Sequence, residues 1–137
     1  MTLYILDTDH VSLHQRGDQT VLARLQSRTD DTVCVTIITV EEQMRGRLAQ
    51  LGQAGVSLPF VYNLLQATSS YFCNIPVLPF DALAQQYYQQ LLVQKIRIGS
   101  LDLRIAAITM AHNGILVTRN RRDFERVPGL ILEDGSH

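Results

Sequence analysis

The chain of 137 residues has the length of one domain, because a single hydrophobic core typically spans about 50 to 250 residues. Its hydrophobic fraction of 46% and charged fraction of 18% exclude a disordered chain. The net charge of −1 excludes a strong overall field toward nucleic acid, although eleven of the twelve basic residues are arginine. No apolar run approaches the roughly 20 residues of a membrane span, and the amino terminus lacks the basic region of a secretory signal. We therefore expect a cytoplasmic protein without membrane contact.

The predicted elements alternate between strands and helices. Short apolar runs rich in β-branched residues predict strands at 3–6, 32–38, 75–79, 115–118 and 130–132. Helical spacing of apolar residues predicts helices at 21–27, from 39 onward, and at 58–72, 82–92 and 101–112. This alternation indicates an α/β fold of three layers (α/β/α), in which helices cover both faces of a mainly parallel sheet. We expect one domain over residues 1–134, followed by a tail or purification-tag remnant at 135–137.

Acidic residues follow several of these strands or begin a later helix. In an open parallel sheet, ligands bind outside the carboxyl ends of the strands. The candidate residues there are Asp7, Asp9, Glu41, Glu42, Asp102, Asn120 and Asp123. Carboxylates that converge in one cleft repel each other, and a hard cation with oxygen ligands relieves that repulsion. The pattern therefore favours a Mg²⁺ or Mn²⁺ site.

Each acid also has a structural explanation. Glu42 lies three residues after Thr39, which is the spacing of a capping box. Asp102 suits the first turn of a helix, and Asp123 is spaced to pair with the arginine three residues further on. Asp7 is the hardest to explain in this way, because a carboxylate directly after a buried strand must cap a helix, pair with a cation or bind a metal.

The cysteines and histidines do not indicate a metal site. Cys34 and Cys73 lie far apart in apolar surroundings, which predicts two buried free thiols. His10, His14 and His112 have no ligand spacing in common. We expect these histidines to be structural or exposed.

Arginines surround most of the candidate acids. Arg104 follows Asp102, and Arg119, Arg121 and Arg122 lie around Asn120 and Asp123. A negative cleft with a positive rim suits metal-dependent hydrolysis of a polynucleotide backbone. The alternative is that these arginines only keep the surface soluble.

Four segments stand in order along nearly the whole chain. They are YILDTD at 4–9, TVEEQMRG at 39–46, IGSLDLRIAA at 98–107 and VTRNRRDF at 117–124. Together they resemble a PIN-domain ribonuclease, specifically a VapC-type toxin of a bacterial toxin–antitoxin pair. The resemblance implies that Asp7, Glu42 and Asp102 hold Mg²⁺ or Mn²⁺, with a fourth position at Asn120 or, slightly favoured, Asp123. It also implies a homodimer, a VapB-type antitoxin and cleavage of structured RNA, often transfer RNA.

The implied chemistry is metal-assisted attack of water on a phosphodiester, which leaves 5′-phosphate and 3′-hydroxyl ends. Thr8 and Thr118 are candidates to orient a water or a phosphate oxygen, and Asp9 to add charge or support the ligands.

Two other functions fit parts of the sequence. Asp7, Thr8 and Asp9 after a strand also resemble the nucleophile loop of haloacid-dehalogenase-type phosphatases. Such enzymes need a lysine near the phosphate, and the sole lysine, Lys95, lies within a helical pattern away from the strand ends. The second alternative is a catalytically inactive PIN-like interaction domain that keeps its acids for stability.

Overall fold

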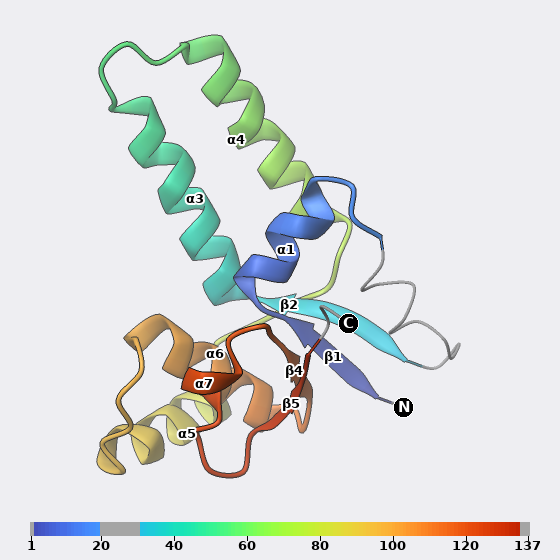
Figure 1. The fold of residues 1–137 in the computed structure, drawn as a ribbon, viewed down its shortest axis with the longest axis vertical. Coiled ribbons are helices and arrows are strands. Elements are labelled where there is room, and N and C mark those ends of the chain that lie inside the picture. The colour runs from blue at the N-terminus through green and yellow to red at the C-terminus, as the bar shows by residue number, and fades with distance from the viewer. Residues whose placement is uncertain (1, 20–30, 135–137) are drawn as a thin grey trace.

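The computed structural model describes residues 2–19 and 31–134 (Figure 1). The strands in these ranges are β1 (Leu3–Leu6), β2 (Thr32–Thr36), β3 (Val77–Leu78), β4 (Ile115–Val117) and β5 (Ile131–Glu133). The helices are α1 (Thr8–Gln15), α3 (Ile37–Leu51), α4 (Leu58–Cys73), α5 (Ala82–Val93), α6 (Ser100–Ala111) and α7 (Arg121–Phe124). The predicted helix at 21–27 and the predicted tail at 135–137 lie outside the described residues.

The five strands form one parallel sheet in the order β3-β2-β1-β4-β5. The chain therefore builds one half of the sheet outward from β1 and then crosses to build the other half. Leu6 of β1 pairs with Val117 of β4, so the residues that follow them, Asp7 and Thr118, leave the sheet side by side. This reversal of strand order is where open α/β sheets bind ligands.

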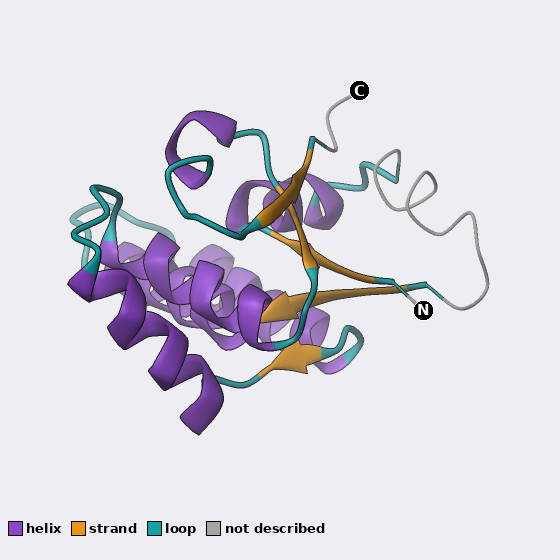
Figure 2. Ribbon diagram, turned by 90° about the horizontal axis from the view of Figure 1, so that it is seen from below, coloured by secondary structure: helices purple, strands orange, loops and turns teal. Residues whose placement is uncertain are grey.

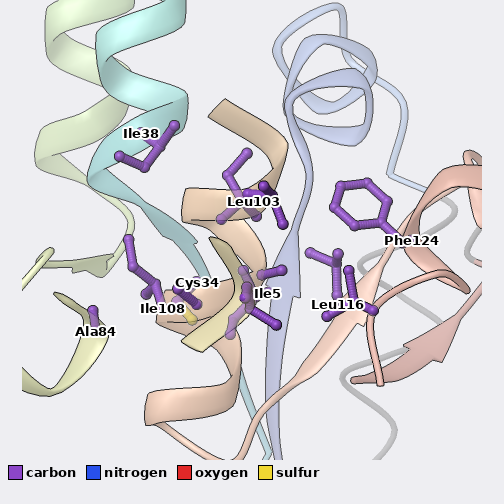
Figure 3. Close-up of a cluster of buried hydrophobic side chains, with 13 residues drawn as sticks. Ile5, Cys34, Ile38, Ala84, Leu103, Ile108, Leu116 and Phe124 are labelled. Atoms are coloured by element: carbon purple, nitrogen blue, oxygen red, sulfur yellow. The ribbon is translucent and has the colours of Figure 1, made fainter. Parts of the chain in front are cut away.

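Side chains that alternate along the strands enter two apolar clusters on opposite faces of the sheet. One cluster contains Ile5, Cys34 and Leu116 and packs against α5, α6 and α7 (Figure 3). The other contains Leu6, Val33, Val35 and Val117 and packs against residues of α1 and α4. Helices therefore cover both faces (Figure 2), which confirms the predicted three-layer α/β fold.

Helix α3 begins earlier than the sequence predicts. The hydroxyl of Thr36 accepts a hydrogen bond from the backbone N–H of Thr39 at 3.3 Å and caps the helix. The strand predicted to reach residue 38 therefore ends at Thr36, because the cap outweighs the strand preference of the next two β-branched residues. Since Thr39 lies inside the first turn, the capping-box explanation of Glu42 is wrong.

Helix α1 is absent from the predicted elements, because its short sequence carries little apolar periodicity. The residues at its two ends are what indicate a helix. The Asp7 carboxylate accepts a hydrogen bond from the backbone N–H of His10 at 3.0 Å and caps the first turn. At the other end Gly17 has a φ of 96°, and the N–H groups of Gly17 and Asp18 donate to last-turn carbonyls at 3.0 and 3.1 Å. These bonds form a Schellman motif, so both ends of α1 are fixed.

The remaining predictions have mixed outcomes. None of the helices in the described ranges is long and apolar enough to cross a membrane. Cys34 is buried as predicted, whereas Cys73, in the last turn of α4, is exposed to solvent. His10 is buried in the fold, and a ring nitrogen of His14 contacts the Tyr71 hydroxyl at 2.7 Å, so both are structural as expected.

Candidate active site

Asp7 lies at the carboxyl end of the central strand and is only 6% exposed. Its Oδ1 accepts the backbone N–H of His10 at 3.0 Å, and its Oδ2 accepts the Thr118 hydroxyl at 2.7 Å. Burial raises the pKa of Asp7, and these two hydrogen bonds partly offset that effect. Asp7 therefore caps α1 and also places a fixed carboxylate where the strand order of the sheet reverses.

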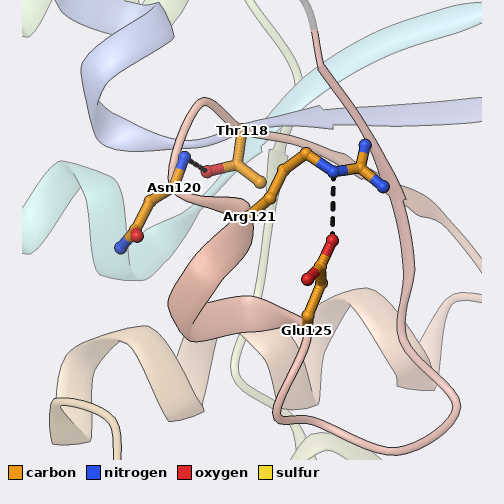
Figure 4. A network of polar contacts seen from close by, with 4 residues as sticks. All are labelled: Thr118, Asn120, Arg121 and Glu125. Carbon is orange, nitrogen blue, oxygen red and sulfur yellow. Dashed lines mark hydrogen bonds and ion pairs between the residues drawn. The ribbon is translucent and has the colours of Figure 1, made fainter.

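Thr118 connects the ends of β1 and β4. Its fully buried hydroxyl donates to Asp7 and accepts the backbone N–H of Asn120 at 2.9 Å (Figure 4). The predicted role of Thr118 in orienting a water or a phosphate oxygen stays a prediction, and in this structure the hydroxyl is buried and bonded within the protein. Thr118 thereby orients a site carboxylate and the loop after β4.

Glu42 reaches the site from α3. The Thr8 hydroxyl donates to its Oε1 at 2.9 Å, which ties α3 to the start of α1. Further along the same two helices, Gln43 donates to the Ser12 hydroxyl at 3.3 Å. The neighbouring acid, Glu41, pairs with Arg45 on α3 instead. These contacts place Glu42, and not Glu41, beside the residues that follow β1.

Asp102 shows that the acids converge. It lies in the first turn of α6, and its pKa is raised to about 6. Burial is the largest cause, followed by the negative charges of Glu42, Asp7, Asp123 and Asp9. Acids from three other segments therefore act on the Asp102 carboxyl group, which its place in the first turn of α6 does not by itself explain.

Asn120 and Asp123 lie next to each other at the start of α7. The Asn120 side-chain amide donates to the Asp123 carboxylate at 3.1 Å. The predicted pair between Asp123 and Arg126 is absent from the described contacts, because Arg126 donates to the Arg97 carbonyl at 2.8 Å. Both candidates for the fourth position therefore reach the same edge of the site.

The predicted arginine rim is only partly present. The Cζ atom of Arg104 lies over the ring of Tyr88, 5.4 Å from its centroid. The guanidinium group therefore makes a cation–π contact with Tyr88. Arg121 donates to Glu125 at 3.2 Å and turns away from the Asn120 amide (Figure 4). Arg122 is exposed and lines neither of the hollows beside the site.

Two open hollows adjoin the acids, on either side of α1. The first, of about 630 Å³, is lined by Asp9, Ser12, Leu13, Arg16, Arg119 and Asn120. The second, of about 450 Å³, is lined by Thr8, Ser12, Gln15, Arg16, Glu42, Gln43, Gly46, Arg47 and Leu64. Arg119 is thus the predicted rim residue that lies at the site, and Arg16 is a lining residue that the sequence reasoning missed. The glycine that follows Arg16 is the signal that would have marked it as a helix end.

These side chains fit a divalent cation in kind and in charge. Hard cations prefer carboxylate and amide oxygens, and no described lysine or arginine forms an ion pair with Asp7, Glu42 or Asp102. In their present positions, however, no three His, Cys, Asp or Glu side chains of the described residues form a group that could hold a metal ion. Binding would therefore require the carboxyl groups to draw together.

Comparison with known sequences finds relatives that are named as VapC nucleases, although no protein-family profile matches this chain. VapC ribonuclease Y4jK of Sinorhizobium fredii is 32% identical over 130 residues, which cover 90% of this chain and 91% of that protein. Ribonuclease VapC2 of Rickettsia felis is 40% identical over 68 residues, about half of either protein (47% of this chain and 51% of that one). The tRNA(fMet)-specific endonuclease VapC of Shigella flexneri is 25% identical over 141 residues and matches 99% of this chain and 100% of its own length.

Solved structures share the fold over almost the whole chain. VapBC-1 from nontypeable Haemophilus influenzae has a TM-score of 0.78 at 23% identity and covers 99% of this chain and 100% of its own. DNA-bound VapBC from Salmonella typhimurium has a TM-score of 0.77 at 25% identity, with 98% and 99% covered. Given the 32% identity to a VapC ribonuclease over nine tenths of its length, the chain belongs to the VapC family of PIN-domain ribonucleases.

Proposed function

We propose that this protein is a metal-dependent endoribonuclease, the toxin of a toxin–antitoxin pair. Asp7, Glu42 and Asp102 would hold Mg²⁺ or Mn²⁺, with Asp123 at the fourth position. The 32% identity to a VapC ribonuclease over nine tenths of the chain carries the proposal. The negative charges of Glu42, Asp7 and Asp123, which help to raise the pKa of Asp102, support this choice of acids. The ribonuclease names of its relatives support the assignment of the activity.

Two of the proposed ligands, Asp7 and Glu42, accept hydrogen bonds that position them. Thr118 and the backbone of His10 hold Asp7, and the Thr8 hydroxyl holds Glu42. The chemistry that Mg²⁺ or Mn²⁺ would supply there is a lower pKa for water and positive charge against the scissile phosphate. Water attack would release 5′-phosphate and 3′-hydroxyl ends.

The two alternative functions are less well supported. In the phosphatase alternative Asp7 would attack a phosphate beside a lysine. That lysine is missing from the site, since the sole lysine, Lys95, follows α5 as an exposed residue. The inactive interaction domain is distinguished by the experiment below.

The proposed partners follow from the relatives. Several of the similar solved structures are VapBC toxin–antitoxin complexes, some of them bound to DNA. We propose that this chain likewise binds a VapB-type antitoxin and cleaves a structured RNA, such as transfer RNA. A homodimer and a cytoplasmic location complete the proposal.

The test uses the full chain, a transcript of tRNA(fMet) and total transfer RNA, with MgCl₂ or with excess EDTA. We expect cleavage in Mg²⁺ alone, with 5′-phosphate ends on the downstream fragments. Asp7→Asn and Glu42→Gln should each lower the rate by about a hundredfold or more, because each removes a ligand charge.

Glu41→Gln is the matched control, since it neutralises the adjacent acid that pairs with Arg45, and it should keep the wild-type rate. Cleavage in EDTA, or full activity of Asp7→Asn, would overturn the proposed mechanism. If neither RNA is cut while Mg²⁺ still raises the melting temperature, the inactive-domain alternative holds.

A further inference from the structure

Arg16 stands between the two hollows that adjoin the carboxylates. Both hollows are lined by Ser12 and Arg16. The first also contains Asp9 and Arg119, and the second contains Glu42. An extended polymer that crosses from one hollow to the other would therefore pass Arg16, with Asp9 in the first hollow and Glu42 in the second.

The guanidinium groups of Arg16 and Arg119 have no side-chain partner among the described residues. The arginines that have a partner within the described residues are Arg45, Arg47, Arg104, Arg121 and Arg126. In contrast, Arg16 and Arg119 are exposed and make no hydrogen bond or ion pair through their side chains with another described residue. Two such groups in one polar hollow suit a phosphate, because the planar fork of arginine matches two phosphate oxygens.

The backbone of Arg16 is fixed relative to the site. Its N–H donates to the carbonyls of Ser12 and Leu13 at 3.2 and 3.1 Å, and the Schellman motif that follows closes the helix end. From Asp9 to Arg16 the helix rises about 10 Å. Arg16 is therefore placed to meet the RNA backbone away from the scissile phosphate.

We infer that Arg16 binds a phosphate of the RNA substrate in the hollow that it shares with Arg119, and so positions the strand across the carboxylates. This inference rests on the proposed ribonuclease function. The contact between Arg16 and the phosphate would be equally strong in the ground state and in the transition state of RNA cleavage. Removal of Arg16 should therefore raise KM and leave kcat unchanged.

A purely structural role would give a different result. A cation at the carboxyl end of a helix interacts favourably with the helix dipole. If that were the whole role of Arg16, its removal would lower the melting temperature and leave RNA affinity unchanged.

The experiment measures the Kd of the full chain for a labelled tRNA(fMet) transcript in EDTA, across about 50 to 200 mM NaCl. We expect Arg16→Ala to weaken binding by about five- to tenfold and to reduce the slope of log Kd against log salt by about one. Arg16→Lys should keep the slope and recover part of the affinity, because it keeps the charge without the planar fork. Arg45→Ala is the matched control, since it removes the same charge outside both hollows.

Cleavage in Mg²⁺ then separates the two proposals. A raised KM with unchanged kcat in Arg16→Ala supports the inference. If the wild type cleaves RNA but Arg16→Ala binds with the same Kd and salt slope as Arg45→Ala, the inference is overturned and the ribonuclease function stands. If the wild type neither cleaves nor binds either RNA, the ribonuclease function itself fails.

Discussion

At the scale of single residues, one buried hydroxyl organises the centre of the site. Thr118 joins Asp7 to the loop that carries Asn120, across 111 residues of sequence. A side chain so placed affects the geometry of the site without contact with the RNA. It is therefore a positioning residue for the proposed catalytic carboxylate.

Thr118→Val tests this role, because valine keeps the shape but can neither donate to Asp7 nor accept from Asn120. We expect a loss of about 1 to 3 kcal/mol of stability and at least about a tenfold fall in kcat for RNA cleavage. The matched control is Thr109→Val, which removes an equally buried hydroxyl that binds the Ile105 carbonyl within α6. An equal loss of kcat in both variants would contradict a specific role for Thr118.

The acids of the candidate site could be proposed from the sequence because strand ends and turns are local features. Asp7 and Glu42 follow recognisable strands, and Asp102 follows a glycine and serine that open a helix. The partners of these acids could not be predicted in the same way. The contact between Thr118 and Asp7 depends on the strand order, and Arg16 depends on a helix that the apolar pattern does not reveal.

At the scale of elements, capping decided the boundaries that the apolar pattern placed wrongly. The residues after Thr36 have strand propensity, yet the Thr36 hydroxyl binds the N–H of Thr39 and starts α3 there. Likewise Asp7 and Gly17 define α1, in which few side chains are buried. Local hydrogen bonds at helix ends thus outweighed intrinsic preferences, while long apolar runs were located within one or two residues.

Two glycines, one before β4 and one inside α3, allow a matched test of packing. A Cβ on Gly114, which precedes β4, would lie 2.7 Å from Ile5 Cδ1 and 3.2 Å from the Leu3 carbonyl oxygen. Gly114→Ala should therefore destabilise the fold by about 1 to 3 kcal/mol. Gly46→Ala, inside α3 with open space around it, should stabilise the fold by up to about 1 kcal/mol. Urea unfolding measures both, and shifts of the same sign would contradict this account.

At the scale of the whole molecule, the fold brings together negative charges that repel one another. The acids come from the ends of β1, from α3, from α6 and from α7, and each lies near the same edge of the sheet. Burial and this repulsion oppose the ionised form of Asp102. The charged acids therefore lower the free energy of unfolding by an amount that depends on pH.

The sign of that dependence follows from the pKa. Folding raises the pKa of Asp102 from 3.8 to about 6, so the folded chain binds this proton more tightly than the unfolded chain. The contribution of Asp102 to stability is full below pH about 4 and is lost as the pH rises through about 6. In buffer without divalent cations, Asp102→Asn should raise the melting temperature at pH about 7.5 and not at pH about 4.

The expected gain is on the order of 1 kcal/mol, or about 3 °C, because solvent screens a half-buried group. Thermal unfolding at both pH values measures it, with Glu41→Gln as the control for loss of an acid outside the cluster. The same shift at pH 4 and pH 7.5 would show that charge repulsion is not its cause.

The central place of β1 in the sheet also has a consequence for biosynthesis. On the ribosome β1 is made well before its neighbour β4, because 111 residues separate Asp7 from Thr118. A nascent chain that has not yet reached β4 lacks the bond that fixes Asp7 and both candidates for the fourth position. We therefore expect such a chain to be unable to cut the RNA that surrounds it during its own synthesis.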